Sequence, residues 1–151
     1  MNFPDVLAFL IRDRSWDGLP LGRVKHILHR LHELDQIELL STSEAGGPAE
    51  MMVMWSWLRP EAERRYARHG FEGLKPDDLG TEGRLWLIGL SAPGGAEHLT
   101  MALAWAGKNL PSDDAKERFR CLAPIEEQGK PEPVAFVIEG PGRGSIKPVH
   151  V

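Results

Sequence analysis

The stretch LSAPGGAEH, residues 90–98, combines the residue types of this chain that are best suited to chemistry. Ser91 brings a hydroxyl group, His98 brings an imidazole, and a proline-glycine-glycine turn lies between them. An apolar run typical of a helix follows the turn, and the first amides of a helix are unpaired and carry positive partial charge. Adjacent glycines let a ligand approach those amides closely. The spacing therefore predicts a site that binds phosphate or polarises a carbonyl oxygen.

The residues expected to contact a ligand there are Ala92, Pro93, Gly94, Gly95 and Ala96. Ser91 could donate a hydrogen bond to a thioester or its oxyanion, and His98 would lie in the first helical turn beside it. A purely structural interpretation stays open, because two glycines also permit a tight turn between a strand and a helix. The motif is neither a P-loop nor a dinucleotide-binding fingerprint.

Hydrophobic periodicity and turn residues predict the elements that position this site. Helices are expected at 3–16, 23–36, 59–70 and 95–111, and strands at 37–42, 50–58, 84–92, 117–124, 133–140 and, as an edge, 145–151. The segment 84–92 is apolar on both faces, which is typical of a central strand. We expect an α+β fold with a mostly antiparallel central sheet flanked by helices, in one domain over 1–151.

This order of elements resembles the GNAT acyltransferase fold, in which the strand–turn–helix unit holds the phosphate-bearing arm of an acyl donor. Short motifs over most of the chain are similar to the toxin-activating lysine acyltransferases, which fatty-acylate lysines of RTX toxins. MVMWSWLRPEAERRY, GTEGRLWLIGLSAPGG, ERFRCLAP and RDRSW carry this resemblance. Its matching residues are Trp16, Ser56, Trp57, Tyr66, Gly83, Arg84, Trp86, Ala92, Pro93 and Gly95.

The resemblance implies a protein that transfers an acyl group from acyl carrier protein or acyl-CoA to a protein lysine or another amine. The donor is then a substrate, and neither a permanently bound cofactor nor a metal is expected. The family's histidine corresponds to Asp13 and its aspartate to Gly89, which has no side chain to accept a proton. Asp13, Ser91 and His98 are therefore the candidate catalytic residues.

The same observations allow two other interpretations of the function. Without the family's histidine and aspartate, the chain would be a catalytically inactive GNAT-like protein, such as a regulator or a phage- or defence-related binding module. An unrelated α+β binding domain is the other alternative. Family members can be dimers, and the hairpin at 37–58 or the strand at 145–151 would offer an edge for a homodimer.

Charge and composition limit the kinds of partner and of compartment that we expect for this chain. The net charge is −4, and the clustered basic residues at 64–69 share a helix with acidic ones, which argues against a nucleic-acid surface. No apolar run reaches the roughly 18–20 residues that span a bilayer. A single cysteine, Cys121, favours a reducing cytoplasm and a buried structural role. His26, His29 and His32 recur every three residues, which is not the spacing of a zinc-binding helix pair.

Overall fold

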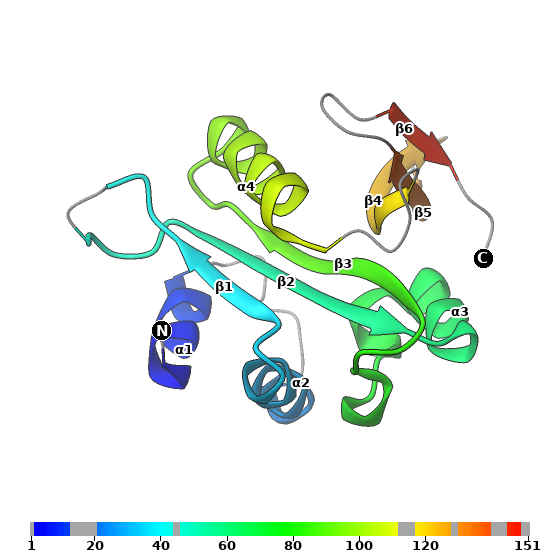
Figure 1. Ribbon diagram of the computed structural model, residues 1–151, viewed down its shortest axis with the longest axis horizontal. Coiled ribbons are helices and arrows are strands. Elements are labelled where there is room, and N and C mark those ends of the chain that lie inside the picture. The colour runs from blue at the N-terminus through cyan, green and yellow to red at the C-terminus, as the bar shows by residue number, and fades with distance from the viewer. Residues whose placement is uncertain are drawn as a thin grey trace. The chain divides into compact units, whose positions relative to one another are not determined.

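The computed structural model describes residues 2–12, 21–43, 46–111, 117–127, 130–139 and 145–148 (Figure 1). Its helices are α1 (Phe3–Arg12), α2 (Leu21–Glu33), α3 (Pro60–His69) and α4 (Ala96–Asn109), and two 3-10 turns cover Gly70–Gly73 and Pro76–Asp78. Its strands are β1 (Ile37–Leu40), β2 (Met51–Leu58), β3 (Arg84–Ser91), β4 (Glu117–Glu127), β5 (Lys130–Glu139) and β6 (Ser145–Pro148).

The predicted α+β fold is confirmed, and the sheet is mixed. Its strands follow one another in the order of the chain, from β1 to β6. The pairs β1–β2, β4–β5 and β5–β6 are antiparallel, while β3 and β4, which are joined through α4, run parallel. Each predicted element occurs among the described residues, although 13–16 of the first expected helix and 149–151 of the last expected strand lie outside them. Strands β4 and β5 are longer than expected because their ladder continues as far as Glu127 and Lys130.

The chain divides into two compact units. Unit 1 comprises 1–55 and 89–109, and unit 2 comprises 56–88 and 110–151. Strands β2 and β3 each contribute residues to both units. The expected single domain over 1–151 stays a prediction, and each unit is described by itself below.

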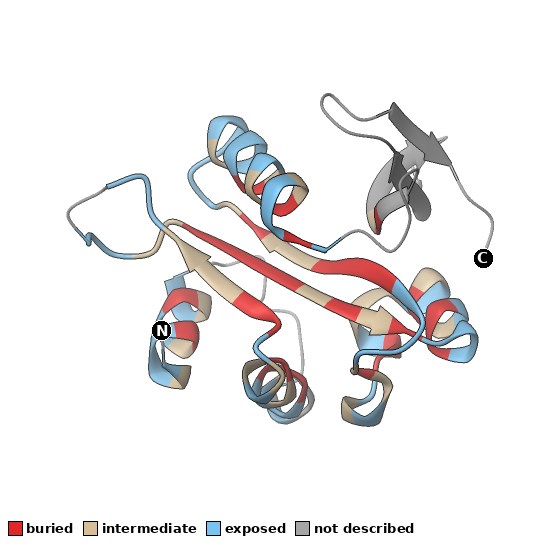
Figure 2. Cartoon of the chain, in the orientation of Figure 1, coloured by how far each residue is buried: buried red, intermediate tan, exposed pale blue. Residues whose placement is uncertain are grey.

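Unit 1 is a layered structure around the hairpin of β1 and β2. In Figure 1, α1 and α2 lie on one side of this hairpin and α4 lies on the other. The first four residues of β2, Met51–Met54, are accordingly buried on both faces, as the red segment in Figure 2 shows. Because helices cover both sides, this strand is apolar throughout instead of alternating with polar residues.

The ends of α1 and α3 follow from their sequences. Asn2 and Asp5 form reciprocal backbone-to-side-chain hydrogen bonds of 3.0 and 3.1 Å, which satisfy two amides at the start of α1. Helix α3 begins with Pro60, whose fixed φ suits a first helical position. It ends at Gly70, which has a φ of +64° and therefore stops the helix without the steric cost of a side chain.

Unit 2 is centred on the first part of β3, where Leu85, Trp86, Leu87 and Ile88 are all buried. Tyr66 of α3 contacts the Trp86 ring edge-to-face, with a centroid distance of 5.5 Å. The core of this unit is thus built by large side chains from α3 and β3 packed on each other.

Gly83 immediately precedes β3, and its backbone conformation determines how the chain enters this strand. Its φ is +109°, and a Cβ at this position would overlap the carbonyl oxygen of Leu58. We expect Gly83→Ala to lower the free energy of unfolding by about 2–4 kcal/mol, because both the φ value and the backbone contact oppose a side chain. Urea denaturation measures the change.

Gly22→Ala in α2 is the matched control, since a Cβ there would meet nothing within 4 Å. This substitution should leave stability unchanged or raise it by up to about 1 kcal/mol. Equal effects of the two substitutions would show that Gly83 is not under conformational constraint.

Candidate functional site

The strand–turn–helix corner at 91–98 lies entirely in unit 1. The Gly95 amide donates to the Ala92 carbonyl oxygen at 3.1 Å, and the Leu99 amide donates to the Gly95 carbonyl oxygen at 3.1 Å. Gly95 therefore precedes the first turn of α4, and its φ of +109° requires glycine. The amides of Ala96, Glu97 and His98 have no acceptor within the helix, so this helix start can bind a polar ligand group.

The structure brings His98 back onto the glycine turn. A Cβ at Gly94 would overlap the Nδ1 and Cε1 atoms of the His98 imidazole. Nδ1 is buried and has no hydrogen-bond partner among the residues that the structure describes. Burial of an unpaired ring nitrogen costs free energy, so a group that could pair with it would be favoured here.

Ser91 is the last residue of β3 and is only 4% exposed. Its Oγ is also buried without a partner in the described part of the chain, and it forms no hydrogen bond to His98. The sequence predicted Ser91 and His98 as polar groups of this corner. Among the described residues, neither Ser91 Oγ nor His98 Nδ1 has a hydrogen-bond partner.

Glu50 is a member of this region that sequence reasoning missed. Its Oε2 accepts hydrogen bonds from the Thr42 amide at 2.8 Å and from the Thr42 hydroxyl at 2.5 Å. These bonds, together with a smaller contribution from positive charge on His98, hold the pKa of the Glu50 carboxyl below its ordinary value. Glu50 and His98 are too far apart in sequence for any motif to reveal this interaction.

The family resemblance points to two further positions, Asp13 and Gly89. Asp13 lies outside the described residues. Gly89, at the position of the family's aspartate, faces Met54, and a Cβ there would overlap the Met54 Cε atom. Since Met54 is fully buried, its methyl group fills the space into which a side chain at position 89 would project.

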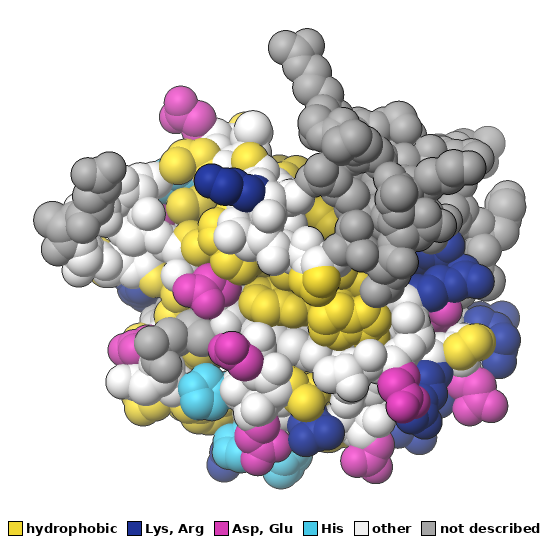
Figure 3. Space-filling view, in the orientation of Figure 1, with side chains coloured by type: hydrophobic (Ala, Val, Ile, Leu, Met, Phe, Trp, Pro, Cys, Tyr) yellow, Lys and Arg dark blue, Asp and Glu magenta, His cyan; other side chains and the backbone are white. Residues whose placement is uncertain are grey.

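The three histidines of α2 do not form a shared site. His26 and His29 are exposed, and the Phe3 ring contacts His29 and His32 edge-to-face at centroid distances of 5.4 and 5.9 Å. Figure 3 shows histidine side chains in cyan among charged ones on the surface. Within the described ranges, no three histidine, cysteine or acidic side chains gather closely enough to hold a metal ion.

The basic residues of α3 also lie at the surface, where Figure 3 shows Lys and Arg in dark blue beside acidic side chains in magenta. Arg65 pairs with Asp78, and Arg64, Arg68 and His69 are largely solvent-exposed. This mixture of charges is typical of a solvated helix face.

Several residues that carry the family resemblance have structural partners in unit 2. Ser56 Oγ accepts a hydrogen bond from the Gly80 amide at 3.0 Å, and the Tyr66 hydroxyl donates to the Ile88 carbonyl oxygen at 3.0 Å. Burial raises the pKa of the Tyr66 hydroxyl far above its ordinary value, so Tyr66 stays neutral and acts as a donor. These residues stabilise unit 2 through hydrogen bonds that are buried for Tyr66 and partly buried for Ser56.

Cys121 was expected to be buried, and the structure places it at intermediate exposure as a free cysteine. Burial raises the pKa of its thiol, and a neutral thiol is a poor nucleophile.

Glu63 is a buried carboxylate to which no role was assigned from the sequence. It is 3% exposed, and its Oε2 accepts a hydrogen bond from Trp86 Nε1 at 3.0 Å. Arg120 Nη1 lies 4.0 Å from Oε2, and Arg84 Nε lies 3.9 Å from Oε1. The carboxylate therefore compensates two guanidinium groups and one indole donor, which makes it a structural centre of unit 2.

Comparisons with known proteins identify no family, since the chain matches no protein-family model and no curated protein. In the part of the chain that the structure describes, no helix is both long and apolar enough to cross a membrane.

Replacement of Glu63 by leucine should lower the free energy of unfolding by about 2–4 kcal/mol, because the Trp86 indole loses its acceptor and the Arg120 guanidinium loses a nearby negative charge. Glu63→Gln keeps an acceptor oxygen and should cost about half as much. Chemical denaturation compares both with Glu61→Gln, an exposed position of the same helix that should change stability by less than about 0.5 kcal/mol. If Glu63→Leu is as stable as the Glu61 control, the carboxylate is not a structural centre.

Glu50 gives a pH-dependent prediction. Because its pKa is lowered from the ordinary value of 4.5, its contribution to stability is present above that value and is lost as the pH falls through the folded-state pKa. The difference in thermal midpoint between wild type and Glu50→Gln should therefore be largest near neutral pH and disappear in strong acid. A difference that grows as the pH falls would contradict this sign.

Proposed function

We propose that this chain is an acyltransferase-like protein with a GNAT-like fold, which binds an acyl thioester donor at the corner formed by residues 91–98. The donor is acyl carrier protein loaded with an acyl chain, or acyl-CoA, and the acceptor is an amine such as a protein lysine. The observation that carries the proposal is the buried, unpartnered Nδ1 of His98 packed against Gly94 beside the open start of α4.

The amides at the start of α4 suit a thioester carbonyl better than a phosphate. The acidic side chain of Glu97 lies in the first helical turn, where it already complements the helix dipole and repels a dianion. A neutral carbonyl oxygen does not suffer this repulsion. The negative charge that develops on this oxygen in the tetrahedral intermediate is smaller and gains most from fixed donors.

His98 would act as the general base. As the amine attacks the carbonyl carbon, the new N–C bond forms, and the imidazole accepts the proton that the nitrogen loses. The C–S bond then breaks, and the thiolate leaves with that proton from the imidazolium. Glu50 would stabilise the imidazolium between the two steps, and the Ser91 hydroxyl would donate to the oxyanion. Asp13, at the position of the family's histidine, stays a proposed partner in this chemistry.

A binding protein without catalysis is the second candidate. The observation in its favour is that Met54 fills the space beside Gly89, where the family has an aspartate. Such a protein would hold the donor at the same corner and release it unchanged. Partnership with acyl carrier protein and a homodimeric state are predictions that follow from the resemblance, and a cytoplasmic location is a prediction from the single cysteine.

Two assays on the same samples measure donor binding and acyl transfer independently. Octanoyl-CoA and octanoyl-acyl carrier protein should raise the thermal midpoint of the wild-type protein, because a ligand that binds only the folded state stabilises it. Mass spectrometry then follows acyl transfer to lysine in a mixture of unstructured peptides. His98→Gln should reduce the midpoint shift, because the donor keeps the α4 amides but loses the imidazole, and it should lower transfer by about a hundredfold or more.

His29→Gln is the matched control, since His29 is an exposed histidine of α2 and should behave as wild type. Gly94→Leu should displace the His98 ring and weaken donor binding much more than it lowers stability. Donor binding without transfer would establish the binding protein instead of the enzyme. If neither donor shifts the thermal midpoint and no transfer occurs, both candidates fail.

A further inference from the structure

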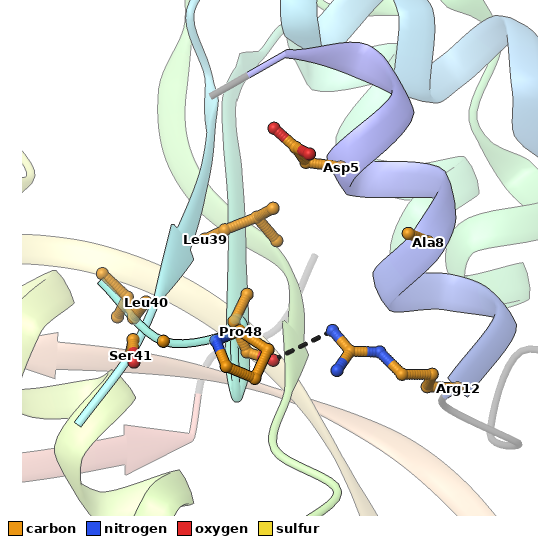
Figure 4. A pocket seen from close by; sticks show the side chains of 9 residues that line it. Asp5, Ala8, Arg12, Leu39, Leu40, Ser41 and Pro48 are labelled. Carbon is orange, nitrogen blue, oxygen red and sulfur yellow. Dashed lines mark hydrogen bonds between the residues drawn. The ribbon is translucent and has the colours of Figure 1, made fainter. Parts of the chain in front are cut away.

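A groove in unit 1 lies between helix α1 and strand β1. Its volume is about 530 Å³, within the range of natural ligand sites. Asp5, Ala8 and Arg12 line it from α1, Leu39 and Ser41 from β1 and its end, and Ala49 from the following loop. Figure 4 shows Asp5 at one end of this groove and Arg12 at the other, nearer to Ser41 and Pro48.

One wall of the groove is a strand edge that pairs with no other described strand. Strand β1 is the first strand in the sheet order. The Gln36 carbonyl accepts from the Trp55 amide at 3.0 Å, and the Leu40 carbonyl accepts from the Glu50 amide at 2.8 Å. Because backbone groups alternate in direction along an antiparallel ladder, the amide and carbonyl of Leu39 point away from β2. They have no partner among the described residues and can pair with an added strand.

Arg12 closes one end of the groove. Its Nη2 donates to the Ala49 carbonyl oxygen at 3.1 Å, a bridge that appears as the dashed line in Figure 4. This bridge blocks an extended chain from continuing past Ser41. A guanidinium has five N–H donors, so further donors of Arg12 are available to a carboxylate. A peptide that ends here with its C-terminal carboxylate fits both features.

Asp5 places a negative charge at the opposite end of the groove. It lies seven residues before Arg12 on the same helix, which is about 10.5 Å along the axis. This length equals about three residues of extended peptide. One Asp5 oxygen accepts from the Asn2 amide at 3.1 Å, and the other has no partner in the described part of the chain. A basic side chain two positions before the peptide's last residue would share its face and reach that oxygen.

We propose that this groove binds the C-terminal segment of an extended peptide that pairs with the free edge of β1 at Leu39. The peptide runs parallel to β1, places its terminal carboxylate on Arg12, and places a lysine or arginine against Asp5. Ala8 and the Leu39 side chain provide an apolar wall for the residue between them. This binding site goes beyond the proposed acyl transfer and does not depend on it.

The test is an NMR titration of the ¹⁵N-labelled full chain with the hexapeptide Ser-Gly-Val-Lys-Thr-Val up to about 1 mM, where even weak binding is visible. The amide signals of Leu39 and Ser41 and the Arg12 Nε signal should shift and saturate together. Hydrogen exchange of the Leu39 amide should become slower, because the amide gains a strand partner. The same peptide with a C-terminal amide should bind at least about tenfold more weakly.

Two variants test the charges. Arg12→Gln should weaken binding about tenfold, whereas Arg12→Lys should retain part of the affinity. Arg64→Gln, an exposed position of unit 2, is the matched control and should leave the affinity unchanged. Thermal midpoints within a few degrees of wild type show that each variant is folded.

The proposal is overturned if the shifts do not saturate, if the amidated peptide binds equally well, or if Arg12→Gln binds as wild type does. Shifts of the same signals that depend on protein concentration without peptide would assign the edge to a second copy of the chain instead. None of these outcomes bears on acyl transfer, so the two proposals can fail separately.

Discussion

The buried hydrogen bonds between α3 and the first part of β3 are the constraint on which the rest of unit 2 depends. Glu63 accepts from the Trp86 indole, and the Tyr66 hydroxyl donates to the Ile88 carbonyl. Both bonds are buried, so breaking either would leave a polar group unpaired in an apolar core. They fix the part of β3 that belongs to unit 2.

The corner after that strand shows how a few residues can create an open polar site. Gly95 adopts a φ that other residues avoid, and α4 therefore starts with unpaired amides. Gly94 has no side chain, so the His98 imidazole can pack onto the turn. Natural proteins usually satisfy buried polar atoms, and the unpaired nitrogen of His98 therefore favours a ligand that pairs with it.

The sequence predicted the elements well because their signals are local. Pro60 and Gly70 mark the ends of α3, and the doubly apolar run at 84–92 marks a buried strand. The turn at 92–95 was also visible, since a proline followed by two glycines is typical of a turn. The parallel pairing of β3 with β4 agrees with the strand–helix–strand unit that the order implies.

Contacts between distant segments were not predictable in the same way. Glu50 approaches His98 only through tertiary folding, and its sequence neighbours give no sign of this. The sequence indicated Gly89 only as a missing catalytic group, whereas the structure adds that Met54 occupies the adjacent space. The edge of β1 and Arg12 form a groove without any motif, because backbone groups carry no sequence signature.

The central claim is that the corner binds an acyl thioester through the α4 amides and His98. Its most direct test is the ¹⁵N NMR signal of the His98 imidazole during titration with octanoyl-pantetheine, which lacks phosphate. The account predicts saturable shifts of His98 Nδ1 and of the Gly95 and Ala96 amides, with His29 unchanged. Unchanged His98, Gly95 and Ala96 signals at saturating donor would contradict it.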